Sequence, residues 1–333
     1  MIIDGRAPAG IAEAVRTLAA GELVGVPTET VYGLAADADN EAAVAKIFAA
    51  KGRPGDHPLI VHVADAAAAP HFAAAIPQFA SRLIAAFWPG PLTLILPRRA
   101  GRAAAAAGGQ SSIGLRCPAH PVAHALLLAC ARATPPIAGL AAPSANKFGR
   151  VSPTTAQHVR SEFGDGLLVL DGGPCEVGIE STIVDCTRGV PVLLRPGVLT
   201  AHAVSAACGQ RLLLPQELEE QQPAPRASGT LESHYAPRAA VRLMDARSLR
   251  TAIDVLGPDG RRIAVYARSP LHSDSGQVVL RRMPDDPARA ARELFAALRE
   301  FDDAGVQLIW VEAPPPGAEW DGVRDRLQRA SVR

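Results

Sequence analysis

The chain has little lysine, few aromatic residues and almost no net charge. Its 333 residues contain lysine only at positions 46, 51 and 147, arginine supplies the other cations, and the formal net charge is +1. Nucleic-acid-binding proteins usually carry a basic face, so the charge excludes a broad polyanion-binding surface. Aromatic residues make up 4% of the chain, which is too few for a base-stacking platform. We therefore expect at most a weak, local RNA contact.

Several other signatures are missing. The five cysteines lack CxxC or metal-ligand spacing, which is typical of reduced thiols in a cytoplasmic protein and predicts no metal site. No uncharged apolar run reaches about 18 residues and no signal-peptide core is present, so we expect neither secretion nor a membrane span. The G-x-x-x-x-G-K-[ST] and G-x-G-x-x-G loops are absent too. Any nucleotide must therefore be held by scattered cations and hydroxyls.

The densest mixture of polar and apolar residues lies in VPTETVYGLAADADNEAAVAKIFAAKGRPGDHPLIVHV, residues 26–63. A short strand over 22–26 is followed by the polar turn 27–30, which includes Thr30. The end of a strand is where α/β proteins usually bind ligands. This stretch is therefore the first candidate for a site.

A helix is predicted over residues 40–51, with Asn40 as its N-cap. Val44 and Ile47 recur at helical spacing, and Lys51 follows Val44 by seven residues on the same apolar face. Lys51 should therefore be buried, and with Arg53 close behind it could hold phosphate or carboxylate. The alternative is a lysine that bends away from the helix end into solvent.

Three further patterns mark candidate residues. His62 lies in the apolar strand predicted over 58–63, where a buried histidine is more often a core residue than a ligand contact. Ser144 and Asn146 follow an apolar strand, although the same sequence is typical of an ordinary loop. Arg116 and Arg195 each end an apolar strand and must find an anion or reach solvent.

Along the chain, strand-like and helix-like segments alternate, which predicts an α/β fold. Strands are expected over 92–96, 113–116, 136–140, 167–170, 182–185 and 192–195, and helices are expected to begin near Pro121 and at Ser152 and Pro153. Residues 210–238 are polar and proline-rich, as a linker would be. Beyond them, strands over 241–244, 263–266, 278–280 and 308–311 and a helix from Pro287 predict a small doubly wound α/β domain.

The motifs of residues 26–63 resemble those of the YrdC-like family of threonylcarbamoyl-AMP synthases. PTETxYGL stands at 27–34, KxRP at 51–54 and PLxxH at 58–62, and they are followed by SSIGLR at 111–116, APSAN at 142–146, SPT at 152–154, ESTIVD at 180–185 and LLRPG at 193–197. HYAP at 234–237 resembles the interdomain segment of the long form. The resemblance implies a twisted mixed-sheet α/β domain over 1–209, a linker or lid segment over 210–238 and a small Rossmann-like α/β domain over 239–333.

The resemblance also implies a reaction. Threonine, bicarbonate and ATP would give threonylcarbamoyl-AMP and pyrophosphate, with Mg²⁺ carried by the triphosphate. A tRNA threonylcarbamoyl transferase would then use the product to modify adenosine 37 of ANN-decoding tRNAs. Carried over position by position, Lys51 and Arg53 become catalytic. The implied threonine contacts are Thr30, His62, Arg116, Ala142 and Ser181, and the implied ATP contacts are Lys51, Arg53, His57, Ser112, Ser144, Asn146, Ser152, Arg195 and Tyr235.

His57 departs from the family pattern, because many members carry asparagine there. Two other functions are compatible with YrdC-like motifs. One is binding of double-stranded RNA or the ribosome, which the near-neutral charge disfavours. The other is carbamoyl adenylation from carbamoyl phosphate, as in hydrogenase maturation proteins, whose acylphosphatase and zinc-finger regions this chain lacks. The linker is expected to act as a lid if Tyr235 reaches the pocket.

Overall fold

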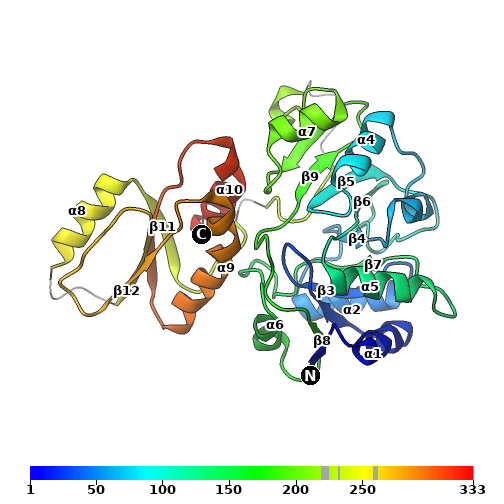
Figure 1. The fold of residues 1–333 in the computed structure, drawn as a ribbon, viewed down its shortest axis with the longest axis horizontal. Helices are drawn as coiled ribbons and strands as arrows, with labels where there is room; N and C mark the ends of the chain where they lie inside the picture. The colour runs from blue at the N-terminus through cyan, green and yellow to red at the C-terminus, as the bar shows by residue number, and fades with distance from the viewer. Residues whose placement is uncertain (219–224, 232, 258–261, 333) are drawn as a thin grey trace.

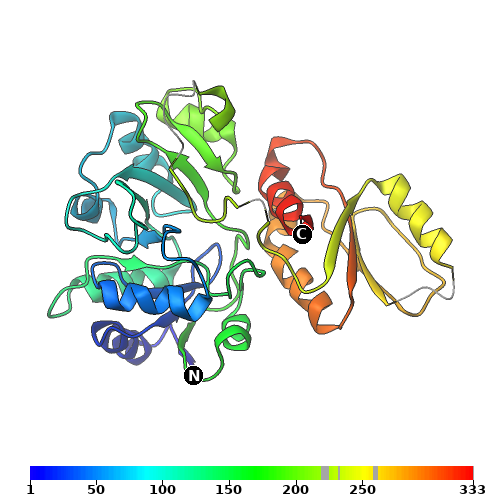
Figure 2. The same ribbon diagram turned by 180° about the vertical axis from the view of Figure 1, so that it is seen from behind.

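The computed structural model describes residues 1–218, 225–231, 233–257 and 262–332. Two α/β units lie side by side, and one stretch of chain connects them (Figures 1 and 2). The first unit contains a ten-stranded mixed sheet and the second a four-stranded parallel sheet. The mixed α/β fold that the sequence predicts is confirmed.

The large sheet has the strand order β1-β8-β2-β3-β7-β4-β6-β5-β9-β10. Its strands are β1 (Ile2–Asp4), β2 (Val24–Val26), β3 (Gly33–Asp37), β4 (Ile60–His62), β5 (Leu92–Pro97), β6 (Ser112–Arg116), β7 (Leu140–Ala141), β8 (Leu168–Asp171), β9 (Thr182–Asp185) and β10 (Val192–Arg195). β4 runs parallel to β6, with His62 opposite Arg116. β9 runs parallel to β5, and β10 returns antiparallel to β9. Residues 62, 116, 181 and 195 therefore lie at the same end of these strands.

Helices cover both faces of the large sheet. They are α1 (Pro8–Ala19), α2 (Glu41–Lys51), α3 (Ala69–Phe72), α4 (Gln78–Phe87), α5 (Pro121–Ala131), α6 (Ala156–Phe163) and α7 (Ala201–Cys208). Leu18 of α1 and Leu126 of α5 belong to the apolar cluster on one face. Ile47 of α2 and Leu83 of α4 belong to the larger cluster on the other. Burial of these apolar stripes is the main driving force for assembling the layers.

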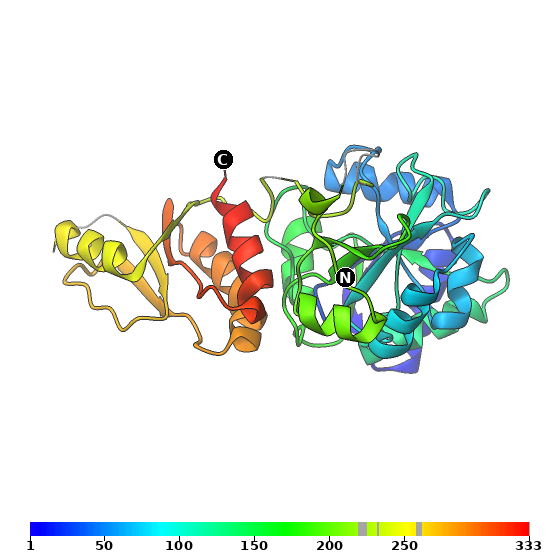
Figure 3. The same cartoon turned by 90° about the horizontal axis from the view of Figure 1, so that it is seen from above.

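The small sheet is parallel throughout, in the order β11-β14-β12-β13. Its elements are β11 (Ala240–Met244), α8 (Ala246–Leu256), β12 (Ile263–Ala267), β13 (Val278–Arg282), α9 (Pro287–Asp303), β14 (Leu308–Glu312) and α10 (Asp321–Ser331). α8 packs on one face, while α9 and α10 cover the face that looks toward the first unit (Figures 1 and 3). Helices on both faces make this the doubly wound arrangement expected from the sequence.

Most predicted elements lie where the sequence places them. Asn40 caps α2 by accepting a hydrogen bond from the amide of Ala43, and α9 begins at Pro287. The helix expected from Ser152 is wrong, because α6 begins at Ala156 and is capped by Thr155. The Ser152 hydroxyl is instead bonded to Glu180, so it is not available as a cap.

The strand expected over 136–140 is also wrong. Only Leu140–Ala141 is extended and paired, as β7. Pro135 and Pro136 have no amide hydrogen to donate to a sheet ladder, which explains the late start. Conversely, β3 has no counterpart among the predicted strands, because its sequence GLAAD contains no β-branched or aromatic residue that would indicate a strand.

The chain between the two sheets lies along the first unit. Leu193 and Leu213 are hydrogen-bonded, Arg226 pairs with Asp56, and Ala236 donates to the carbonyl of Gly149. The described segments of residues 210–238 therefore pack on the first unit, so that Tyr235 reaches its surface. Among all the helices of the described residues, none has the length and apolarity needed to cross a membrane.

Candidate active site

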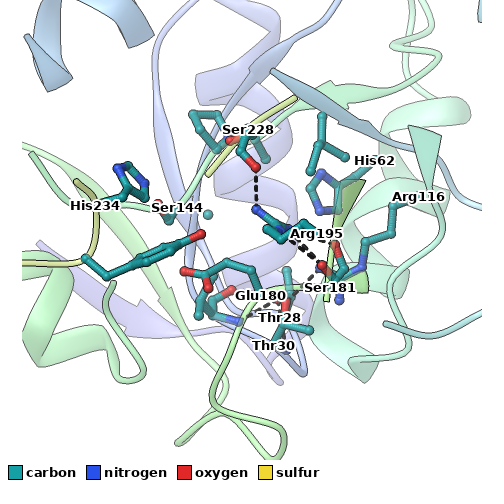
Figure 4. A pocket seen from close by; sticks show the side chains of 16 residues that line it. Thr28, Thr30, His62, Arg116, Ser144, Glu180, Ser181, Arg195, Ser228 and His234 are labelled. Atoms are coloured by element: carbon teal, nitrogen blue, oxygen red, sulfur yellow. Dashed lines mark hydrogen bonds between the residues drawn. The ribbon is translucent and has the colours of Figure 1, made fainter. Parts of the chain in front are cut away.

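A pocket opens at the strand ends where residues 62, 116, 181 and 195 meet (Figure 4). Side chains of the large sheet form its floor, and residues 228, 234 and 235 of the connecting segment form part of its wall. Its lining is Thr28, Thr30, Val31, Gly33, Ile60, His62, Arg116, Ala142, Pro143, Ser144, Glu180, Ser181, Arg195, Ser228, His234 and Tyr235.

Arg116 is the cation at one end of this pocket. Its side chain is almost fully buried, it donates to the Thr30 hydroxyl at 2.7 Å and to the carbonyl of Gly90 at 3.2 Å, and its Nη2 lies 2.6 Å from Glu29 Oε1. The hydroxyls of Thr28 and Thr30 lie 2.9 Å apart. A guanidinium held in this way is positioned for a small anion such as a carboxylate.

Glu29, the ionic partner of Arg116, is a residue that was not predicted from the sequence. Burial alone would raise the pKa of this carboxyl, but the charge of Arg116 and a hydrogen bond from it outweigh burial and lower that pKa. Glu29 thus stays ionised and neutralises Arg116 inside the protein. The signal was present in the sequence, because Glu29 stands between the two threonines of the predicted turn.

Arg195 is the second buried cation of the pocket. It donates from Nη2 to the carbonyl of Ser181 at 2.9 Å and to its hydroxyl at 3.2 Å, and from Nη1 to the carbonyl of Ser228 at 2.7 Å (Figure 4). The Ser181 hydroxyl also lies 2.7 Å from that of Thr93. Because Ser228 belongs to the connecting segment, Arg195 links that segment to the pocket.

Lys51 is buried as its helical spacing predicts, with 2% of its surface exposed. Its ammonium donates to the carbonyls of Ser144, at 2.6 Å, and Asn146. No carboxylate pairs with it among the described residues. Burial, and then the charge of Arg53, lower the pKa of Lys51 well below its ordinary value. Such an amine gains strongly from an incoming anion.

Aromatic and basic side chains lie together beside the pocket. The guanidinium carbon of Arg53 lies 5.7 Å from the centre of the Phe148 ring, and burial lowers the pKa of Arg53 to about 10. Phe148 also meets His57, at 5.4 Å between ring centres, and His234, at 6.0 Å. These groups could accept the flat face of a base.

Eight of the residues carried over from the family motifs line the pocket: Thr30, His62, Arg116, Ala142, Ser144, Ser181, Arg195 and Tyr235. Six lie outside its lining: Lys51, Arg53, His57, Ser112, Asn146 and Ser152. Lys51 and Asn146 contact each other behind Ser144. Ser112 lies at the opposite end of β6 from Arg116.

Glu180, Ser228 and His234 line the pocket although the sequence analysis did not select them. Glu180 begins the ESTIVD motif and His234 begins HYAP, so both stood inside motifs whose other members were chosen. Ser228 lies in the linker, where no local pattern points to a site.

Buried histidines make stability depend on pH. Burial lowers the pKa of both His62 and His234 to about 3, against an unfolded value of about 6.5. The unfolded chain therefore binds more protons between these values, and stability is full above about pH 6.5 and falls with decreasing pH. At pH 5, each histidine is expected to lower the free energy of unfolding by about 2 kcal/mol relative to its value above pH 6.5.

The variant His62→Gln tests this effect. When the free energy of unfolding is measured with urea between pH 7.5 and pH 5, it should depend less on pH in this variant than in wild type. The exposed His272 is the control, and an equal effect of His272→Gln would contradict the assignment.

Comparisons with known proteins match both units of the chain. A Sua5/YciO/YrdC family model, described as Telomere recombination, matches residues 16–197, and a model described as Threonylcarbamoyl-AMP synthase, C-terminal domain, matches residues 199–332. The threonylcarbamoyl-AMP synthase of Pyrococcus abyssi is 37% identical, covering 93% of this chain and 91% of its own. That of Bacillus subtilis is also 37% identical, covering 96% and 92%.

A solved structure shows the same architecture. The crystal structure of P. abyssi Sua5 complexed with L-threonine superposes with a TM-score of 0.86 at 36% identity, over 96% of this chain and 94% of that one. The similarity thus includes the pocket-bearing sheet, the connecting segment and the small parallel sheet. The chain belongs to the Sua5/YciO/YrdC family, in the two-domain form that carries the Sua5 C-terminal domain.

Proposed function

We propose that this protein is a threonylcarbamoyl-AMP synthase, which condenses L-threonine, bicarbonate and ATP into threonylcarbamoyl-AMP and pyrophosphate. The observation that carries the proposal is a pocket lined by two buried guanidinium groups. Arg116 is hydrogen-bonded to the hydroxyl of Thr30, and Arg195 is hydrogen-bonded to the hydroxyl of Ser181. It lies in a chain that is similar over nearly its whole length to proteins of that name. The product would serve t6A modification of tRNA adenosine 37.

Threonine is assigned to the end of the pocket that contains Arg116. The guanidinium of Arg116 would bind the carboxylate, and the hydroxyls of Thr30 and Ser181 lie within the same lining. His62 stays neutral there, because burial lowers the pKa to about 3, so it can exchange hydrogen bonds with the threonine hydroxyl without adding charge. The backbone of Ala142 completes the set.

ATP is assigned to the side of the pocket near Lys51 and Arg53, two buried cations that lie outside its lining. Lys51 and Arg53 are the proposed catalytic cations, because a loose transition state at phosphorus needs positioning and charge neutralisation rather than a protein nucleophile. Mg²⁺ would arrive with the triphosphate. The remaining proposed contacts are His57, Ser112, Ser144, Asn146, Ser152, Arg195 and Tyr235.

The proposed chemistry balances without an enzyme-bound intermediate. The threonine amine attacks bicarbonate and forms an N-carbamate with loss of water. A carbamate oxygen then attacks the α-phosphorus of ATP, the bond to the bridging oxygen breaks, and pyrophosphate leaves with the electron pair. The reaction is a nucleotidyl transfer, which defines the enzyme class that we propose.

The connecting segment is proposed to act as a lid. Ser228 accepts a hydrogen bond from Arg195, and His234 and Tyr235 line the pocket. Excluding water would protect a labile carbamate and the mixed anhydride. We propose residues 210–238 as this lid segment, residues 1–209 as the catalytic domain and 239–333 as the C-terminal domain. A cytoplasmic tRNA threonylcarbamoyl transferase would receive the product.

Pyrophosphate release tests the proposal. The purified full-length chain is incubated with ATP and Mg²⁺ while threonine and bicarbonate are each supplied or withheld. We expect release only when both are present, because the carbamate is the attacking group. Release that does not respond to threonine would contradict the proposed reaction and favour carbamoyl adenylation from another donor.

A further inference from the structure

Arg326 extends from the C-terminal domain into the first domain. It lies on α10, its side chain is completely buried, and it ranks among the largest fully buried side chains of the described residues. α10 comes very close to the first domain, since a Cβ at Gly322 would lie 2.7 Å from the carbonyl oxygen of Gly197. A guanidinium in such a place must be fully paired, because burying an unpaired charge is very costly.

The partners of Arg326 are groups at the back of the pocket. Its Nε donates to Glu180 Oε2 at 2.8 Å, Nη2 donates to the carbonyl of Glu180 at 3.1 Å, and Nη1 donates to the carbonyl of Pro196 at 2.8 Å. Asp325, its neighbour on α10, accepts from Nη1 at 2.7 Å. The guanidinium carbon lies 5.2 Å from the centre of the Tyr235 ring. One residue of α10 thus contacts two residues that line the pocket, Glu180 and Tyr235.

Glu180 needs this partner. It is 7% exposed, and its second oxygen accepts a hydrogen bond from the Ser152 hydroxyl. Burial would raise the pKa of Glu180, but the charges of Arg326 and then Arg195 outweigh burial and lower that pKa. Without Arg326, a buried carboxylate would face the pocket with too little neutralisation. An anionic ligand nearby would then be repelled.

We propose that Arg326 is a positioning residue through which the C-terminal domain takes part in the reaction of the first domain. It neutralises and orients Glu180, which in turn accepts the hydrogen bond that holds the Ser152 hydroxyl, and its guanidinium packs against the ring of Tyr235. Because Ser152 and Tyr235 are on the proposed ATP side, the inference rests on the proposed function. It gives the second domain a role at the pocket besides its own folding.

The first consequence concerns ATP affinity. Arg326→Met should weaken binding of α,β-methylene-ATP, which cannot react at the α-phosphorus, by about tenfold or more at pH 8, since Glu180 would then repel the triphosphate. Binding of L-threonine should change by no more than about threefold, because Arg116 is held by separate partners. Isothermal titration calorimetry on the full-length protein measures both.

A matched control separates this role from loss of the domain interface. Arg292, on α9, also reaches the first domain, where it donates to the carbonyl of Glu176 at 2.7 Å. Glu176 does not line the pocket and is not among the proposed ATP contacts. Arg292→Met should therefore leave the analogue affinity within about threefold of wild type. Equal losses of affinity in the two variants would overturn the proposal.

The charge of Glu180 provides a second readout. Adding Glu180→Gln to Arg326→Met should restore most of the analogue affinity, because the uncompensated charge is gone. In the single variant, affinity relative to wild type should rise as the pH is lowered, because burial without the charge of Arg326 raises the pKa of Glu180 and favours its protonated form. The groups facing Glu180 are Lys51, Arg195, His234, Tyr235, Asp325 and Arg326. No recovery in the double variant would overturn the proposal.

Arg326→Lys covers the case in which the methionine variant does not fold. Lysine keeps the positive charge but cannot make the several hydrogen bonds that the planar guanidinium makes. An intermediate loss of analogue affinity is therefore expected. Unchanged affinity would contradict a role for these hydrogen bonds. Analogue binding also separates this inference from the proposed function. Wild-type protein that binds the analogue but releases no pyrophosphate with threonine would refute the synthase reaction and leave the Arg326 comparison valid.

Discussion

Lys51→Met is expected to lower the rate of pyrophosphate release by about 10²–10³-fold or more, because it removes the buried cation that we propose neutralises the phosphates of ATP. The ammonium is bonded only to the carbonyls of Ser144 and Asn146 among the described residues. Burial keeps its pKa low in the ligand-free protein. An amine in this state is poorly suited to stabilise the fold and well suited to bind a polyanion.

A measurement of stability separates a lysine that binds phosphate from a lysine that supports the fold. Replacing a buried cation that has no carboxylate partner by a methionine of similar length should change the free energy of unfolding by less than about 2 kcal/mol. Lys46→Met is the matched control on the same helix, since Lys46 is exposed and pairs with Glu22, and its rate should equal that of wild type. A structural lysine would give the opposite result, with a large loss of stability and a proportionate loss of rate.

Arg116→Met is expected to abolish threonine binding and to destabilise the protein by about 3–5 kcal/mol, because it leaves Glu29 buried without its counter-charge. The two side chains are 5% and 8% exposed and their charged atoms lie 2.6 Å apart. Arg116 also holds the Thr30 hydroxyl. Urea unfolding measures the destabilisation, and calorimetric titration with L-threonine measures the loss of binding.

The double variant Glu29→Gln/Arg116→Met separates stability from binding. Removing both charges should restore at least half of the lost free energy of unfolding, since neither group is then an unpaired ion. Threonine binding should remain undetectable, because the partner for its carboxylate is still missing. Recovery of threonine binding together with stability would show that Arg116 supports the fold and does not contact the amino acid.

The sequence predicted the parts of the site that local patterns encode. The burial of Lys51 followed from its seven-residue spacing to Val44. That His62 and Arg116 share one site was implied only by the family motifs, and the structure places them opposite each other on β4 and β6. Competition for a side chain explains one error. Ser152 has the character of a helix cap, but its hydroxyl is bonded to Glu180, so Thr155 caps α6 instead.

The missed residues depend on partners far away in the chain. Glu29, in the turn between β2 and β3, pairs with Arg116 at the end of β6, and the partner of Glu180 lies 146 residues away on α10. Nothing in the sequence around an isolated glutamate shows whether it will face solvent or a buried guanidinium. Only the packing of the two domains brings Arg326 to Glu180, so the role of the C-terminal domain could not be predicted from motifs.

The most direct test of the account follows the carbon of bicarbonate. The full-length protein is mixed with ATP, Mg²⁺, L-threonine and ¹³C-bicarbonate, the reaction is quenched rapidly, and the adenylate is analysed by mass spectrometry. The proposed reaction predicts threonylcarbamoyl-AMP that is heavier by one mass unit than the product from unlabelled bicarbonate, and no such product without threonine. Formation of AMP and pyrophosphate with no labelled adenylate would contradict it.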